Sequence, residues 1–363
     1  SILYKNLEKT EQALQVGSSH SALEISGFFG IQAVTAPEMA GGLSFKDLED
    51  KIRASIAEFE TRGVTDEDLQ IIKSQILQSS YSQLSSIDSK AEVLSHYNMM
   101  KGNGYNLQDD IDRYNAVTKQ DVINVYNKYL KGKKAVIIRV EREQKRDQDD
   151  ETPKSINPHA SEPKTMDKQY VGLEYKAPKD NFDRAARPVI PAASAFTLPE
   201  FYTTKFDNGL KVIGTESKES PLVYFYIDMK GGHLLEADKK VGNGTAMMTA
   251  SLMGEGTKTL TTEQFTRELE KLGSRISFSS STMGTTVFVS SLTSNVDKTL
   301  ALLKDALLNP RFDEADFKRI KKQIIDNLDN QKSNPSVMAR KAWGKILYEG
   351  TILEEYYYGD YKS

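Results

Sequence analysis

The chain has 363 residues and a mass of 40.7 kDa, with 48 Lys and Arg against 51 Asp and Glu, and no cysteine. A single hydrophobic core rarely grows beyond about 250–300 residues, so this length predicts two domains. The net charge of −3 leaves no basic surplus for phosphates, which argues against a dedicated nucleic-acid-binding protein. The absence of cysteine excludes disulfides, cysteine-ligated zinc, iron–sulfur clusters and thiol catalysis.

The first part of the chain predicts strands followed by helices. The stretch 21–36 is β-prone and contains two glycines, which favours paired strands or a bulge. Apolar residues at helical spacing predict a helix over 48–59. Thr65–Asp68 and Thr118–Asp121 are typical of capping boxes, and each predicts the start of a further helix. Residues 135–140, with the sequence AVIIRV, predict a buried strand.

A proline-rich, charged segment divides the chain. Between 141 and 200 lie seven of the eleven prolines, and a dense run of charges stands at the front of this segment. Proline at this spacing permits neither a long helix nor a central strand. The composition favours a solvated linker over a binding segment, and we place the linker at 142–198. The sequence therefore predicts one domain at 1–141 and a second at 199–363.

The second domain begins with predicted strands and ends in helices. Short strands are expected at 202–205 and 211–215, and residues 222–229 are apolar on both faces, which predicts a central strand. A helix is expected near 244–253, and a capping box at Thr261–Gln264 begins the next one. A hairpin and three further helices are expected at 275–281 with 285–292, then at 296–308, 313–331 and 336–348.

The two predicted domains share a repeat. A shift of 248 residues superimposes Asp68, Ile72, Lys73, Gln75 and Ile76 on the same residue types at Asp316, Ile320, Lys321, Gln323 and Ile324. In both domains a pair of strands precedes an apolar-faced helix, an acidic cap and a lysine-containing helix. Amphipathic helices share such patterns by chance, but the matching order of elements favours two copies of one α+β unit.

The order of these landmarks resembles that of the M16 (pitrilysin and insulinase-like) metallopeptidases. Ser1–Leu7, Val64–Leu69 and Val117–Val122 resemble the back half of an M16 repeat. Phe206–Val212 resembles the start of a fresh repeat, and its continuation over 231–257 is family-like in order and spacing. Each motif is weak alone, whereas their order together is specific. The resemblance covers nearly all of the chain except the linker.

The resemblance implies an α+β fold with two related M16-type (metallohydrolase-like) domains, each a mainly antiparallel sheet with helices packed on one side. They would form the centre of a two-repeat protein, with the back half of repeat one at 1–141 and the front half of repeat two at 199–363. In the family, such halves close around an extended peptide. The expected partners are a peptide or unfolded protein substrate and the remaining domains of the parent chain, without nucleic acid and without a membrane span.

In this family a His-x-x-Glu-His helix and a downstream glutamate hold zinc, and the motif glutamate can act as base for metal-bound water. Counting back from Gly256 places the two histidine positions at Met247 and Ser251. The base position holds Ala250, and the downstream glutamate falls near Asn327. The resemblance therefore implies no catalytic residue, metal ligand or cofactor in this chain, and any zinc of the parent protein is expected upstream of it.

The other candidate residues give only weak indications of a functional site. His233 and Glu236 imitate half of a zinc motif, but no second histidine lies on the same helix turn. We interpret His233 as an ordinary polar residue at a strand end. The glycines between 231 and 244 lack the Gly-Lys-Ser/Thr ending of a phosphate loop.

Three hypotheses follow for function. In the first, the chain is a non-catalytic chamber wall and hinge of a zinc metalloendopeptidase that degrades or processes peptides, and is inactive by itself. In the second, the parent is a wholly inactive M16-like scaffold or peptide-binding protein. In the third, the resemblance is superficial and the chain is an unrelated two-domain binding protein, since fold alone does not decide function. The sequence leaves substrate, oligomeric state and compartment open; it shows no signal-peptide pattern, and an exported, periplasmic bacterial parent is compatible with it.

Overall fold

The computed structural model describes residues 1–23, 25–35, 42–102, 107–140, 183, 186, 198–239, 241–332 and 334–354. Its contacts divide the chain into two compact units, one made of Ser1–Lys134 with Ser217–Ser363 and the other of Ala135–Glu216. Helices and antiparallel sheets occur together, so the expected α+β class is confirmed. The predicted linker at 142–198 lies almost wholly outside the described residues, and the predicted domain boundaries stay predictions.

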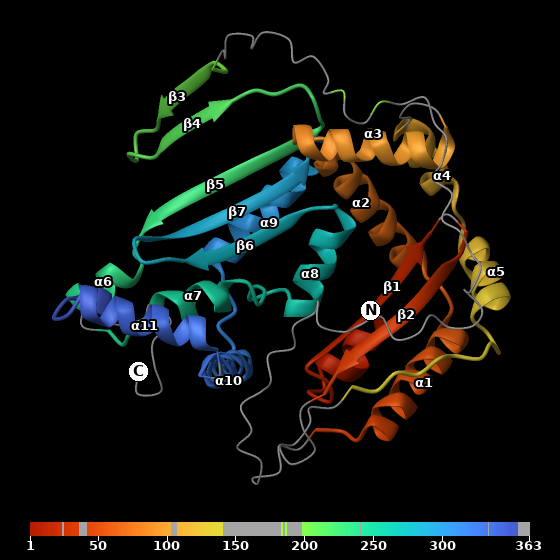
Figure 1. The fold of residues 1–363 in the computed structure, drawn as a ribbon. Helices are drawn as coiled ribbons and strands as arrows, with labels where there is room; N and C mark the ends of the chain where they lie inside the picture. Colours follow the sequence, from red (N-terminus) through yellow and green to blue (C-terminus); the bar gives the residue numbers. More distant parts are fainter. Residues whose placement is uncertain are drawn as a thin grey trace. The chain divides into compact units, whose positions relative to one another are not determined.

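An antiparallel hairpin stands near the start of the larger unit (Figure 1). After the short π-helix η1 (Tyr4–Glu8), strand β1 (Gln15–Ala22) pairs with β2 (Gly27–Val34). The paired strands expected at 21–36 are present, but they begin earlier, because the polar residues of β1 give no apolar alternation. Helix α1 (Phe45–Arg62) follows as expected. A small buried cluster joins these elements through Leu7, Ala13 and Leu48.

Four further helices follow, namely α2 (Asp66–Gln83), α3 (Ile87–Lys101), α4 (Leu107–Ala116) and α5 (Lys119–Tyr129). Both capping boxes expected in this region are confirmed. Thr65 and Asp68 exchange side-chain-to-backbone hydrogen bonds at the start of α2. Thr118 and Asp121 do the same at the start of α5. Each box satisfies backbone N–H groups that the first helical turn leaves without intrahelical partners.

Residues 135–140 do not form the buried strand that the sequence predicts. They have no regular secondary structure, and Val136 is 91 % exposed and Ile138 81 % exposed. An apolar run becomes a buried strand only where a neighbouring strand pairs with it and a second layer covers it. No strand of the described part of the chain pairs with this run, so the prediction was wrong.

A three-stranded antiparallel sheet organises the rest of the larger unit. Its strands are β5 (Leu222–Lys230), β6 (Arg275–Ser280) and β7 (Gly284–Leu292), in the order β5–β7–β6. One face packs against α8 (Thr262–Lys271) and α9 (Val296–Leu308), and Figure 1 shows α9 behind the sheet. The buried core consists of Phe265, Leu269, Ile276, Val287, Val289, Leu303 and Ala306.

Strand β5 lies at an edge of this sheet, so the central position predicted for residues 222–229 was wrong. Phe225, Ile227 and Met229 pack against the core, as expected for one face. On the other face, Tyr224 is 42 % exposed and Tyr226 is 69 % exposed. Tyrosine rings count as apolar in a pattern, but their hydroxyl groups let them remain at a surface.

The remaining helices of the larger unit are α6 (His233–Lys239), α7 (Thr245–Met253), α10 (Glu314–Gln331) and α11 (Pro335–Leu347), with the short 3-10 helices η4 (Thr293–Asn295) and η5 (Ile352–Glu354). Of the α-helices in this part, only α6 was not expected from the sequence. In the smaller unit, β3 (Phe201–Lys205) pairs with β4 (Lys211–Thr215), near the expected ranges. None of the described helices is long and apolar enough to cross a membrane.

The 248-residue repeat is visible in the helix bounds. Adding 248 to the bounds of α2 gives those of α10, and both helices have 18 residues. In each part a strand pair precedes the matching helices, β1–β2 before α1 and β6–β7 before α9. This agreement supports the interpretation of two copies of one α+β unit.

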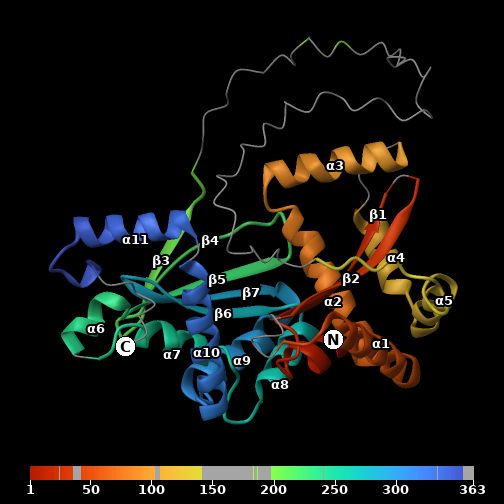
Figure 2. The same cartoon turned by 60° about the horizontal axis from the view of Figure 1, so that its bottom comes forward.

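Helices α2 and α8 pack together and join parts of the chain that are distant in sequence (Figure 2). Lys271 Nζ lies 2.6 Å from Glu67 Oε1, and Arg267 Nη1 lies 3.3 Å from Glu67 Oε2. The hydroxyl of Ser74 donates a hydrogen bond to the carbonyl oxygen of Lys271 at 2.9 Å. The hydrogen bond from Lys271 lowers the pKa of Glu67, and the carboxylates of Glu268 and Glu67 raise the pKa of Lys271.

Candidate functional site

Helix α7, which carries the three motif positions, begins at a buried carboxylate. Glu236 is 3 % exposed and accepts hydrogen bonds from the backbone N–H groups of Gly244 at 3.1 Å and Ala246 at 2.7 Å. These N–H groups belong to the start of the helix, where no intrahelical acceptor exists. The Glu236 carboxylate therefore caps α7, and its charge also favours the positive end of the helix dipole.

His233 completes this cap. Its Nδ1 lies 2.8 Å from Glu236 Oε2, its Nε2 lies 3.0 Å from the carbonyl oxygen of Ile352, and its side chain is 2 % exposed. The carbonyl oxygen of Ile352 can only accept a hydrogen bond, so Nε2 of His233 is the donor to it. The Glu236 carboxylate faces Nδ1 and accepts hydrogen bonds from the backbone of α7 as well. The interpretation of His233 as a polar residue at a strand end was wrong in its location, because His233 begins α6 and holds Glu236 and η5 together.

The positions of the two motif histidines and of the motif base lie on α7. Met247 and Ser251 are one turn apart and half-buried, and Ala250 is 3 % exposed. The Ser251 hydroxyl donates to the carbonyl oxygen of Met247 at 3.0 Å and lies 3.6 Å from its sulfur atom. The only hydroxyl of the three positions is thus bonded within its own helix, as Ser and Thr often are in helices.

These residues do not fit a zinc ion. Zinc sites in proteins are built from cysteine, histidine and carboxylate ligands, whereas α7 offers a thioether, a methyl group and a bonded hydroxyl. Asn327 on α10 and its neighbours Asp326 and Asp329 are exposed, although α10 does contact α7. Within the described ranges, no three His, Cys, Asp or Glu side chains form a group that could hold a metal.

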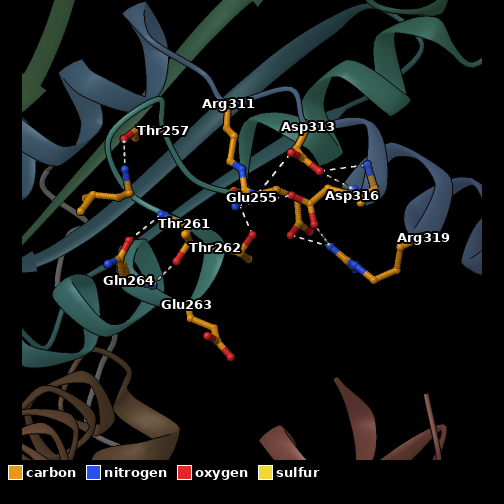
Figure 3. Close-up of polar contacts among 12 residues, drawn as sticks. Glu255, Thr257, Thr261, Thr262, Glu263, Gln264, Arg311, Asp313, Asp316 and Arg319 are labelled. Atoms are coloured by element: carbon orange, nitrogen blue, oxygen red, sulfur yellow. Dashed lines mark hydrogen bonds and ion pairs between the residues drawn. The ribbon is translucent and has the colours of Figure 1, made fainter. Parts of the chain in front are cut away.

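An ion-pair network that the sequence did not predict joins the end of α7 to α10 (Figure 3). Arg319 Nη2 lies 2.6 Å from Glu255 Oε2 and 3.3 Å from Asp316 Oδ1. Burial acts to lower the pKa of Arg319, but its hydrogen bonds to Glu255 and Asp316 outweigh burial and raise it. Arg311 adds ion pairs to Asp313 at 3.3 Å and Asp316 at 3.9 Å. The network fixes the segment after α7 on α10.

The sheet face opposite the core helices carries exposed aromatic rings. The Phe288 ring on β7 stacks with Tyr224 at a centroid distance of 6.2 Å and lies 5.1 Å from the Tyr226 ring. Farther along, Thr286 donates a hydrogen bond to Asp228 at 2.7 Å. Aromatic rings beside hydrogen-bonding groups are a combination that suits peptide side chains.

Two protein-family models match the chain. The model described as insulinase (peptidase family M16) matches residues 211–359, and the model described as peptidase M16 inactive domain matches residues 1–76. The first match contains the whole of α7 and α10, and the second contains β1, β2 and α1. One match thus lies before the predicted linker and the other after it, and both models belong to the family that the sequence resembles.

Individual relatives match parts of the chain. A probable mitochondrial-processing peptidase subunit beta of Arabidopsis thaliana is 32 % identical over 132 residues, which cover 36 % of this chain and 24 % of that protein. The non-peptidase homolog YmxG of Helicobacter pylori is 26 % identical over 161 residues, which cover 44 % of this chain and 36 % of that protein. A crystal structure of a peptidase M16 inactive domain from Pseudomonas fluorescens is 23 % identical with a TM-score of 0.43, covering 45 % of this chain and 40 % of that chain. The chain thus spans about a quarter to a third of the curated relatives' length.

Proposed function

Because the chain belongs to the M16 (insulinase) peptidase family, we propose that it is the non-catalytic wall and hinge portion of a zinc metalloendopeptidase that acts on peptides. The observation that carries this proposal is that helix α7 is present but lacks the metal ligands and the base of the zinc motif. The helix keeps its Glu236 cap and its contact with α10, but holds Met247, Ala250 and Ser251 at the ligand and base positions. In this proposal the zinc of the parent protein is bound by another repeat.

The chain's own contribution is to hold the peptide. The aromatic face formed by Tyr224, Tyr226 and Phe288 offers apolar contact to peptide side chains. Among the described strands, β5 and β6 each pair on one side only, so each leaves backbone groups for a further strand. An extended peptide can add to such an edge through main-chain hydrogen bonds.

A second candidate is an M16-like protein without any active site, which binds peptides or serves as a scaffold. The similarity to a non-peptidase homolog favours this candidate. The two candidates differ in the rest of the parent protein. A His-x-x-Glu-His helix in its other repeat selects the first candidate, and the lack of one selects the second.

Metal analysis and a peptide-binding assay test the proposal. After dialysis we expect no stoichiometric zinc and no hydrolysis of casein, together with saturable binding of a labelled extended peptide. Tyr226→Ala is expected to weaken this binding, and Tyr129→Ala, which removes a 60 % exposed tyrosine on α5, serves as the matched control. Chelator-sensitive cleavage would contradict the non-catalytic role. Equal binding by both variants would contradict the role of the aromatic face.

A further inference from the structure

Helix α11 presents an apolar stripe to solvent. The stripe follows the i, i+3, i+4, i+7, i+8 spacing of one helix face and consists of Ala339, Ala342, Trp343, Ile346 and Leu347. All five residues are exposed, and the exposed fractions are 64 % for Trp343, 71 % for Ile346 and 56 % for Leu347. The half-buried residues of α11 lie on another side and include Val337, Lys341 and Gly344. The helix therefore rests on its unit by that side, and the described residues leave the stripe uncovered.

Positive charges border the stripe. The helix from Pro335 to Leu347 contains three basic residues and neither Asp nor Glu. Arg340 and Lys345 are exposed, and the described part of the chain records no ion pair for either of them. At about 100° per residue, Arg340 lies beside Leu347 on one flank of the stripe and Lys345 lies toward Ala342 on the other. The surface is apolar along its centre and basic on both flanks.

We propose that the α11 stripe docks an acidic amphipathic helix of a partner protein. The partner's apolar side chains would pack on the stripe, and its carboxylates would pair with Arg340 and Lys345. Amphipathic helices bind partners through apolar anchors at this spacing, and charges beside the anchors select the partner. This proposal rests on α11 alone and is independent of the peptide-holding role of the sheet.

Charge separates this partner from two other occupants. A second copy of the chain would bring the same cations opposite one another, and like charges across an interface disfavour binding. An anionic bilayer fits less well, because a flat charged surface faces a whole side of a chain whose net charge is −3, whereas a single helix meets mainly the charges within about 10 Å of the stripe. An acidic helix satisfies the cations and covers the stripe at the same time.

The chain contains a built-in reporter for this contact. Trp343 is its single tryptophan and stands on the stripe, so burial of the stripe changes the tryptophan emission of the full chain. The probe is a synthetic helical peptide with leucine at the same spacing and glutamate on both flanks. Its matched control is the same peptide with lysine in place of glutamate. We expect a saturable blue shift with the acidic peptide and none with the basic one.

Variants locate the contact. Ile346→Glu is expected to weaken binding about tenfold or more, because it places a charge in the centre of the stripe. Met283→Glu, which changes a 79 % exposed residue of the β6–β7 turn, is the control and is expected to bind as the unmodified chain does. The double variant Arg340→Glu with Lys345→Glu reverses the charge on both flanks. It is expected to make the chain bind the basic peptide in preference to the acidic one. Circular dichroism checks that each variant is folded.

Three results would overturn the proposal. The first is an equal shift with both peptides, or none with either. The second is a shift with phosphatidylglycerol vesicles and not with the acidic peptide, which would identify a membrane surface instead. The third is a shift that follows the concentration of the chain alone, with dimers in sedimentation, which would identify a second copy as the occupant.

Discussion

A methyl group on Gly273 would lie 2.8 Å from the carbonyl oxygen of Ser74, although the two residues are far apart in the sequence. Gly273 also has a φ of 58°, in the left-handed region that glycine adopts without strain. The turn after α8 therefore touches the backbone of α2, beside the ion pair between Glu67 and Lys271. The close packing of α2 against the end of α8 depends here on a residue without a side chain.

Gly273→Ala should destabilise the chain by about 2–4 kcal/mol, because it adds a backbone clash to the strain of a left-handed alanine. Gly102→Ala is the matched control, since Gly102 has a φ of 70° and a methyl group added there would meet no described atom within 4 Å. The control should lose only the strain, about 1–2 kcal/mol. Urea unfolding measures both losses, and equal losses would contradict the contact with Ser74.

The Glu67 contact should make stability sensitive to acid. Lys271 lowers the pKa of Glu67 from its ordinary value of 4.5, so the ionised carboxylate favours the folded state. This contribution is present above pH 4.5 and is lost as pH falls through the lower pKa of the folded state. Glu67→Gln should therefore lose less stability than the unmodified chain between pH 5 and 3, roughly the range of carboxylate titration. Unfolding midpoints across this range measure the difference.

Glu314→Gln is the control for this acid dependence, because the partner of Glu314 is Lys318 within α10 and the pair joins no distant parts of the chain. The proposed role of Glu67 fails if its variant follows the same acid profile as the unmodified chain. High salt should reduce the effect, since exposed charges are screened.

Glu236→Ala should cost about 3–5 kcal/mol, because it leaves buried N–H groups at the start of α7 and the buried His233 ring without their acceptor. Thr261→Ala removes an ordinary exposed cap of α8 and should cost about 1 kcal/mol. Chemical unfolding compares the two variants. A loss for Glu236→Ala no larger than that for Thr261→Ala would show that the buried cap adds nothing.

Restoring the motif should not restore a peptidase. The triple variant Met247→His, Ala250→Glu and Ser251→His still has Asn327 at the downstream position, and its new polar groups enter a partly apolar site. We expect no hydrolysis and a stability loss of about 1–4 kcal/mol, since Ala250 is 3 % exposed. Thermal unfolding with and without zinc decides the outcome. A variant as stable as the unmodified chain and further stabilised by zinc would mean that the site is open and nearly competent.

Local signals in the sequence were reliable, and signals that need a distant partner were not. The caps at Thr65 and Thr118 were predictable because donor and acceptor lie three residues apart. The edge position of β5 and the exposure of Val136 depend on which strands pair and which layers cover them, and a linear pattern does not contain that information. The same limit applies to the site. The spacing placed the motif positions on one helix, but it did not predict the contact between Glu255 and Arg319.

The packing of α2 on α8 turns the chain between them into a closed loop. The entropy of closing a flexible loop grows only with the logarithm of its length, so a doubling costs about 0.6 kcal/mol. A flexible insertion between Lys134 and Ser217 should therefore cost the joint little free energy, provided that the two ends still reach it.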